Sequence, residues 1–160
     1  MAQILGEKLH ATVVHTDDFA SWDNPTEWYK DMIEHIFIPI EKGTKTLTYH
    51  LSVWEKGKSR GKIENQPVTK IMIVEGVGSS RLEFRQYLDF CIFVDVPESI
   101  CVERGVRRDL ADTPYKSEVE VKKLWIEWME EEEKYFSKHK PIENADAVLD
   151  GTKPFDEQVN

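Results

Sequence analysis

Carboxylates stand where two apolar segments end. Asp17 and Asp18 follow the β-branched run at residues 11–16, and Glu75 closes the apolar run at 70–75. In an open parallel sheet, ligands bind beyond the carboxyl ends of the strands, where such side chains meet. Asp17 and Glu75 together would offer hard oxygen ligands of the kind that Mg²⁺ prefers. The alternative is structural: an aspartate caps the next helix and Glu75 pairs with a lysine.

Three arginines in five residues form a second candidate site: Arg104, Arg107 and Arg108. Arg104 and Arg108 are four residues apart, so they share one face of the predicted helix. Guanidinium groups bind phosphate oxygens in bidentate fashion, which favours a phosphate ligand. A solvated helix end, paired with nearby acids, explains the same pattern without a ligand.

Aromatic residues gather between the first two predicted strands: Phe19, Trp22, Trp28, Tyr49 and Trp54. Such rings could stack on a planar base, and Asp23 could then accept hydrogen bonds from sugar hydroxyls. Taken alone, this segment is more typical of a hairpin packed against a helix. Another apolar stripe, on residues 124–136, is expected to be core.

Composition narrows the class of protein. The 160 residues include 30 acidic and 21 basic ones, for a net charge of −9, so a nucleic-acid polymer is not an expected partner. No apolar run reaches the roughly 20 residues of a membrane span, and no signal peptide is visible. Two cysteines, Cys91 and Cys101, are expected to be reduced and buried, which predicts a cytoplasmic location. Motifs of serine hydrolases, zinc sites and thiol redox centres do not occur.

Strand and helix patterns alternate along the chain, which predicts one α/β domain over residues 1–160 with a mainly parallel sheet. Two strands, at 70–75 and 90–96, are expected to be covered on both faces because they are continuously apolar. His15 is expected to lie next to the core. The predicted helices are 1–10, about 23–40, 81–87, 97–109 and 117–139; the predicted strands are 11–16, a hairpin insertion at about 45–64, 70–75, 90–96 and 145–150.

Six of these segments occur in the order found in the uridine kinase-like branch of the P-loop kinases, which the chain resembles over nearly its whole length. They are residues 14–19 (VHTDDF), 22–28 (WDNPTEW), 49–54, 73–77 (IVEGV), 93–109, and 145–151 (ADAVLDG). The resemblance implies a three-layer P-loop NTPase-like fold, with helices on both faces of a parallel sheet. It also implies ATP-dependent phosphoryl transfer to a hydroxyl of a small, nucleoside-like molecule, with ATP and Mg²⁺ as cofactors.

The resemblance also implies roles for individual residues. Asp17 matches the carboxylate that takes the proton from the substrate hydroxyl near the metal, and Glu75 matches the strand-end acid that holds Mg²⁺. Arg104 and Arg108 match the lid arginines that neutralise the transferred phosphoryl group. The substrate would contact Asp18, Phe19, Asp23, Tyr49 and Trp54, and ATP would contact Arg104, Arg108, Gly151 and Thr152.

Two departures from the family pattern matter. Trp54 replaces the histidine that uridine kinases carry five residues after the tyrosine, which puts uridine itself in doubt. No G-x-x-x-x-G-K-[ST] phosphate loop occurs, since the Gly57-Lys58-Ser59 triplet has Ser52 where the first glycine is required. We therefore expect a chain that lacks the first, central strand and the phosphate loop, with residues 1–10 as the helix that follows that loop.

Three functions remain open on the sequence. A kinase in this form is expected to have little or no activity. The alternative is a non-catalytic homologue that binds a nucleotide or a protein, including a second copy in a homo-oligomer. A metal-dependent phosphate-ester hydrolase using Asp17 and Glu75 has less support, because no partner that would activate a nucleophile is visible.

Overall fold

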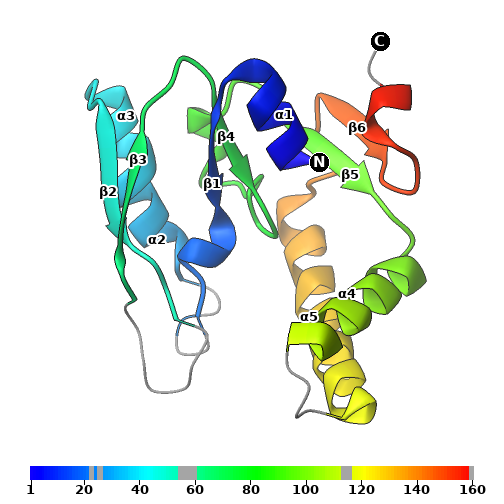
Figure 1. Ribbon diagram of the computed structural model, residues 1–160. Coiled ribbons are helices and arrows are strands. Elements are labelled where there is room, and N and C mark those ends of the chain that lie inside the picture. The colour runs from blue at the N-terminus through cyan, green and yellow to red at the C-terminus, as the bar shows by residue number, and fades with distance from the viewer. Residues whose placement is uncertain (22–23, 25–26, 54–60, 113–116, 159–160) are drawn as a thin grey trace. The chain divides into compact units, whose positions relative to one another are not determined.

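The structure, a computed structural model, describes residues 1–21, 24, 27–53, 61–112 and 117–158. The chain divides into two compact units, Met1–Tyr87 and Leu88–Asn160, which are described in turn. Helices and strands alternate, and the described strands form three two-stranded sheets, two parallel and one antiparallel. The fold is therefore mixed α/β, as predicted, with small sheets (Figure 1).

The first unit pairs two strands that are sixty residues apart in sequence. Strands β1 and β4 run parallel, and their register places His15 opposite Glu75 at the carboxyl ends. Helix α1 packs against both strands (Figure 1). The elements are α1 (Ala2–Leu9), β1 (Thr12–His15), a 3₁₀ turn (Thr16–Asp18), α2 (Tyr29–Met32), a π-helical segment (Ile33–Phe37), α3 (Ile38–Glu41), β2 (Thr46–His50), β3 (Ile63–Pro67), β4 (Met72–Glu75) and a 3₁₀ turn (Arg85–Tyr87).

The predicted hairpin forms from β2 and β3, which pair antiparallel from Thr46–Pro67 to His50–Ile63. Side chains alternate along β2, so Leu47 and Tyr49 point inward and are 1 % and 2 % exposed. The hairpin packs on the π-helical segment, where the core of this unit lies. Its other buried apolar residues include Val14, Met32, Ile36, Phe37 and Phe84.

Two expectations for the end of this unit are wrong. All four residues of β4 are half-buried, although the continuous apolar run favoured a strand covered on both faces. The stretch at 81–87 forms turns and one short 3₁₀ segment instead of a helix. Arg81 is 8 % exposed there, with its guanidinium 3.9 Å from the centre of the Tyr29 ring. Burial of a cation against this ring favours a compact turn over an exposed helical face.

The second unit is built on two long helices and one parallel strand pair. Its elements are β5 (Ile92–Asp95), α4 (Glu98–Asp112), α5 (Glu118–His139), β6 (Ala147–Asp150) and a 3₁₀ turn (Phe155–Glu157). Helix α5 begins with a capping box, in which the Ser117 hydroxyl accepts from the Glu120 amide and the Glu120 carboxylate accepts from the Ser117 amide. The two helices pack through Gly105, where a Cβ atom would lie 2.1 Å from the Trp125 ring.

The second unit is less buried than its sequence predicted. Phe93 of β5 packs on Phe136 of α5, with ring centres 5.8 Å apart, whereas Ile92 and Val94 on the opposite face are 41 % and 40 % exposed. Strand β5 is therefore covered on one face only, because a strand pair that packs on one helix leaves its other face open. Trp128 of the expected core stripe is also 36 % exposed.

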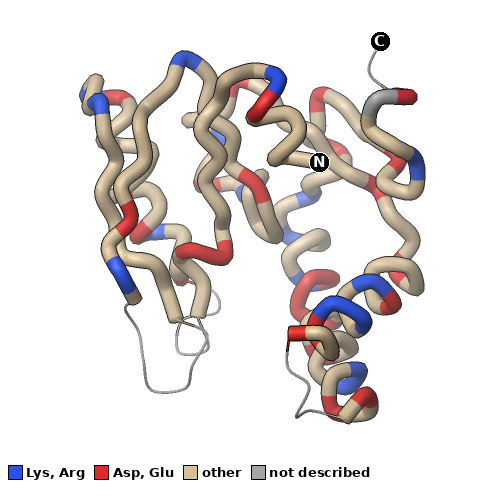
Figure 2. The backbone as a smooth tube through the Cα atoms, in the orientation of Figure 1, with Lys and Arg blue, Asp and Glu red and all other residues tan. Residues whose placement is uncertain are grey.

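The surface carries partly exposed thiols and charged residues of both signs. Both cysteines are free thiols, and both are partly exposed instead of buried. Acidic and basic residues are interspersed along α4 and α5 (Figure 2). None of the helices in the described part of the chain combines the length and the apolar character that crossing a membrane requires.

Candidate functional site

The carboxyl ends of β1 and β4 lie side by side in the first unit, and acidic residues stand at both ends. Asp17 lies in the turn that directly follows β1 and is exposed, and Glu75 is the last residue of β4. His15, the register partner of Glu75, contacts the Glu75 Oε1 atom through its Nδ1 atom. The expectation that His15 lies next to the core is wrong, because its side chain is 46 % exposed. Side chains alternate along β1, so buried Val14 is followed by an exposed His15.

A glycine lets the two strand ends approach each other closely. Gly76 follows Glu75 with a φ of 113°, a backbone conformation that other residues rarely adopt. A Cβ atom there would lie 2.2 Å from the Thr16 Oγ1 atom. That hydroxyl is buried and has no hydrogen-bond partner among the described residues. The Glu75–Gly76 turn is therefore fitted to Thr16, the residue between His15 and Asp17.

Asp18, unlike the exposed Asp17, contacts the hairpin. The Tyr49 hydroxyl donates to Asp18 Oδ2 over 3.3 Å, and the Tyr49 ring stacks on Phe19 with centres 5.0 Å apart. Ser52 secures the turn from the other side, because its amide donates to the Asp18 carbonyl at 2.6 Å and its hydroxyl to the Phe19 carbonyl at 2.7 Å. Sequence reasoning missed Ser52, whose signal is only its position just after a strand.

Burial changes the acidity of this pair. Desolvation raises the pKa of Asp18 above its usual value, and the nearby His15 and the Tyr49 hydrogen bond oppose that rise. The pKa of Tyr49 is also raised, first by burial and then by the Asp18 charge. Tyr49 therefore stays protonated at neutral pH and acts as a hydrogen-bond donor.

The predicted substrate residues separate into two groups. Asp18, Phe19 and Tyr49 are brought together, but Phe19 and Tyr49 are 5 % and 2 % exposed and stack on each other. Their part in holding a base stays a prediction, because in this structure each ring packs in the core. Asp23 and Trp54 lie outside the described residues.

The residues predicted to contact ATP lie in the second unit. Arg104 Nη1 donates to the Gly151 carbonyl at 3.0 Å, so two predicted ATP contacts meet although they are 47 residues apart. Arg108 donates from Nε to Asp109 Oδ1 at 2.9 Å, and Asp109 Oδ2 accepts from the Trp125 indole at 2.9 Å. Asp109, which the sequence did not single out, thus positions Arg108 on the helix.

The loop after β6 is fixed by Asp150. Asp150 Oδ1 accepts from the Thr152 amide at 2.9 Å and from the Thr152 hydroxyl at 2.5 Å, and Lys153 Nζ lies 3.0 Å from Oδ2. These contacts, the Thr152 hydrogen bonds first, lower the pKa of Asp150 to about 2. Gly151 is needed for packing, since a Cβ atom would lie 2.3 Å from Val96 Cγ2. This loop therefore presents the Gly151 carbonyl in a defined place.

The donor set at the β1 and β4 ends suits magnesium better than a transition metal. Asp17 and Glu75 supply carboxylate oxygens, and Mg²⁺ in proteins is typically bound by one or two carboxylates with water and substrate phosphates completing the shell. Within the described ranges, no three His, Cys, Asp or Glu side chains gather as a metal cage. The residues present thus fit a Mg²⁺ ion whose remaining ligands are water and the phosphate oxygens of a substrate.

The fold matches a solved kinase-like structure. The structure of a possible uridine kinase from Bacillus stearothermophilus aligns with a TM-score of 0.61 and 19 % identity, over 93 % of this chain and 79 % of that chain. At this identity the likeness defines the fold, which is that of a P-loop kinase. No curated protein sequence matches the chain.

The sequence itself defines the family. The Phosphoribulokinase / Uridine kinase family matches residues 15–154, which is most of the chain. The chain belongs to this family of ATP-using kinases, within the P-loop NTPase superfamily. The match begins at His15 and spans the acidic strand ends, Arg104 and Arg108, and the loop that Asp150 fixes.

Proposed function

We propose that the function of the protein is ATP-dependent phosphoryl transfer to a hydroxyl of a small, nucleoside-like molecule. The observation that carries the proposal is the pair of acidic ends on adjacent parallel strands: Glu75 ends β4, and Asp17 follows β1 by two residues. Positioning and charge stabilisation supply most of the catalysis in phosphoryl transfer. Family membership supports the class of reaction, and we assign the reaction to these acidic residues.

The two aspartates are suited to different tasks. Asp17 is exposed at the strand end, so its carboxylate can reach a substrate hydroxyl and accept the proton that leaves. Asp18 is half-buried and fixed by Tyr49, so it suits a hydrogen bond to a second substrate hydroxyl. The site therefore favours an acceptor with neighbouring hydroxyl groups, as in a sugar.

Asp17 and Glu75 would hold the metal, with His15 orienting the Glu75 carboxylate through its Nδ1 contact. A Mg²⁺ ion bound there would neutralise charge on the transferred phosphoryl group. In the second unit, Arg104 and Arg108 are exposed on α4 and would contact phosphate oxygens. Gly151 and Thr152, in the loop that Arg104 contacts, would meet the nucleotide.

The experiment measures binding and transfer separately, because no G-x-x-x-x-G-K-[ST] motif occurs in these 160 residues. We expect phosphoryl transfer by this chain to be slow or undetectable. Mn²⁺ binding, followed by electron paramagnetic resonance, is expected to weaken at least about tenfold in Glu75→Gln, because the loss of an outer-shell partner alone already costs about that much. The matched control is Glu41→Gln, an exposed acid on α3, which should bind like the wild type.

Acceptor binding is tested by calorimetry with uridine, cytidine and a panel of non-nucleoside alcohols. Asp18→Asn should weaken the preferred acceptor, and Asp31→Asn, an exposed control on α2, should not. Absence of both Mn²⁺ and acceptor binding would refute the proposal. Dimerisation without nucleotide binding, measured by light scattering, would instead support the non-catalytic homologue that binds a partner.

A further inference from the structure

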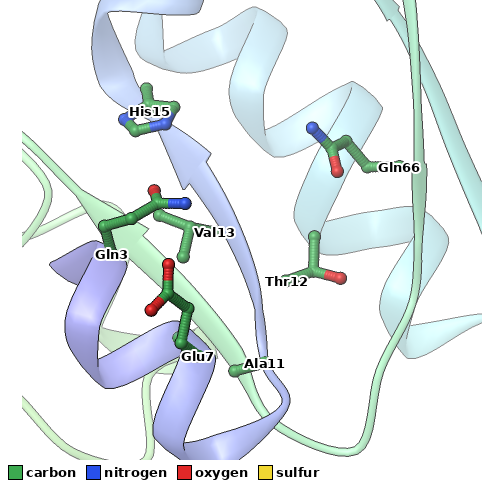
Figure 3. A pocket seen from close by; sticks show the side chains of 8 residues that line it. Gln3, Glu7, Ala11, Thr12, Val13, His15 and Gln66 are labelled. Carbon is green, nitrogen blue, oxygen red and sulfur yellow. The ribbon is translucent and has the colours of Figure 1, made fainter.

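A groove lies in the first unit, beside the candidate site but separate from its acidic ends. It is bounded by α1, β1 and β3 and has a volume of about 380 Å³ (Figure 3). This volume falls within the ~300–1,000 Å³ range of small-molecule sites. Its eight lining residues are Gln3, Gly6, Glu7, Ala11, Thr12, Val13, His15 and Gln66.

The walls of the groove are fixed by hydrogen bonds and by close packing. The Thr12 hydroxyl donates to the Pro67 carbonyl at 2.7 Å, which ties β1 to the end of β3. The Thr12 amide donates to Thr69 Oγ1 at 2.8 Å, which holds the same strand from its amino end. On the other side, a Cβ atom at Gly6 would lie 2.7 Å from Val13 Cγ2, so α1 already sits as close to β1 as its backbone allows.

The polar side chains of the groove favour a cationic ligand over an anionic one. Glu7 supplies a carboxylate, and Gln3, one helical turn earlier, supplies an amide on the same face of α1 (Figure 3). Gln66 adds a second amide from β3. Carboxamides both donate and accept hydrogen bonds, as hydroxyl groups require. None of the eight lining residues is a lysine or arginine, so an anionic ligand would meet the Glu7 charge without compensation.

We propose that this groove binds a small primary amine that also carries hydroxyl groups, of the amino-sugar or amino-alcohol class. The ammonium group pairs with the Glu7 carboxylate, and the hydroxyl groups exchange hydrogen bonds with Gln3 and Gln66. The carbon skeleton lies on the apolar floor formed by Ala11 and Val13. The inference does not rest on the proposed phosphoryl transfer, since none of these contacts involves a phosphate.

The groove is connected to the candidate site through His15. This side chain lines the groove, and its Nδ1 atom contacts Glu75 Oε1 at the end of β4. A ligand that displaces or contacts the imidazole would change how Glu75 is held. Ligand binding in the groove would therefore affect the acidic strand ends through the His15 side chain.

The test is a nuclear magnetic resonance titration of the 160-residue chain with three sugars that share a ring and differ in charge: glucosamine, glucose and glucuronate. Glucosamine is expected to shift the backbone amides of Glu7, Val13 and Gln66 in a saturable manner. Its affinity should exceed that of glucose by about fivefold, the upper range for an exposed ion pair. Glucuronate should bind more weakly than glucose.

Two variants decide whether the charge of Glu7 is responsible. Glu7→Gln should remove the preference for glucosamine and leave glucose binding unchanged. Glu34→Gln, which neutralises an exposed acid of the π-helical segment outside the groove, should retain the full preference. Gln3→Ala should weaken both sugars. The proposal is overturned if the groove amides do not shift, if glucuronate binds as well as glucosamine, or if Glu7→Gln keeps the preference.

Discussion

Replacing Gly76 by alanine perturbs the turn that lies against Thr16. The new residue would have to hold a φ of 113°, and its Cβ atom would lie 2.2 Å from the Thr16 hydroxyl. A sparsely populated backbone conformation costs about 1–3 kcal/mol, and forced overpacking costs a further ~1–3 kcal/mol. We expect Gly76→Ala to lower the free energy of unfolding of the first unit by about 2–6 kcal/mol.

Gly43→Ala provides the matched control. Gly43 also has a positive φ, of 76°, but no atom lies within 4 Å of the position that its Cβ would take. This substitution carries the backbone cost alone, about 1–2 kcal/mol. The difference between the two variants isolates the close approach of Gly76 to Thr16.

Both variants are measured by urea denaturation, followed by tryptophan fluorescence, and by thermal melting. A loss of 1 kcal/mol lowers Tm by about 2–4 °C in a chain of this size. Gly76→Ala should also weaken Mn²⁺ binding, because Glu75 precedes the altered residue and Thr16 packs against it. Gly43→Ala should leave Mn²⁺ binding unchanged. Equal losses of stability in the two variants would refute the packing argument, whatever their absolute size.

Further predictions concern the two aspartates that bond to a neighbouring hydroxyl. Tyr49→Phe keeps the buried ring and removes the donor to Asp18, which should cost about 1 kcal/mol in urea unfolding because the bond is long at 3.3 Å; an unchanged midpoint would contradict the hydrogen bond. Asp150 has a folded pKa of about 2, below its unfolded value, so its contribution to stability is present at neutral pH and is lost as pH falls toward 2. Asp150→Asn should therefore flatten the acid side of the stability profile between about pH 4 and pH 2, and a profile that keeps the wild-type slope would contradict the Thr152 contacts.

Local signals predicted most of the secondary structure. The start of α5 at Ser117 and the strand before Asp17 depend on neighbouring residues only, so their positions follow from sequence. Alternation along residues 45–54 likewise predicted β2. In contrast, the same alternation could not show whether Tyr49 is a surface ring for a ligand or a core ring, because that depends on the π-helical segment that covers it.

The expectations that failed concern which strand faces are covered by other elements, and which residues far apart in sequence contact each other. A continuous apolar run shows that β5 can be buried on both faces, but not that a second layer lies over Ile92 and Val94. His15 alternates with Val14, and although the two strand ends were expected to meet, the sequence did not show that Glu75 would contact the His15 side chain. The contact of Arg104 with Gly151 is hidden for the same reason.

The Arg104–Gly151 contact also bears on the energetics of the phosphate binding that we propose for Arg104. An arginine that already donates to a carbonyl has spent part of its side-chain entropy before any nucleotide arrives. Binding a phosphoryl oxygen then becomes an exchange of acceptors, in which only the difference between a neutral carbonyl and an anion contributes to affinity. Because the carbonyl belongs to the loop fixed by Asp150, release of Arg104 would leave that acceptor to solvent or to the incoming ligand. The resting state thus keeps the guanidinium ordered at a cost in side-chain entropy that a mobile arginine would meet only on binding.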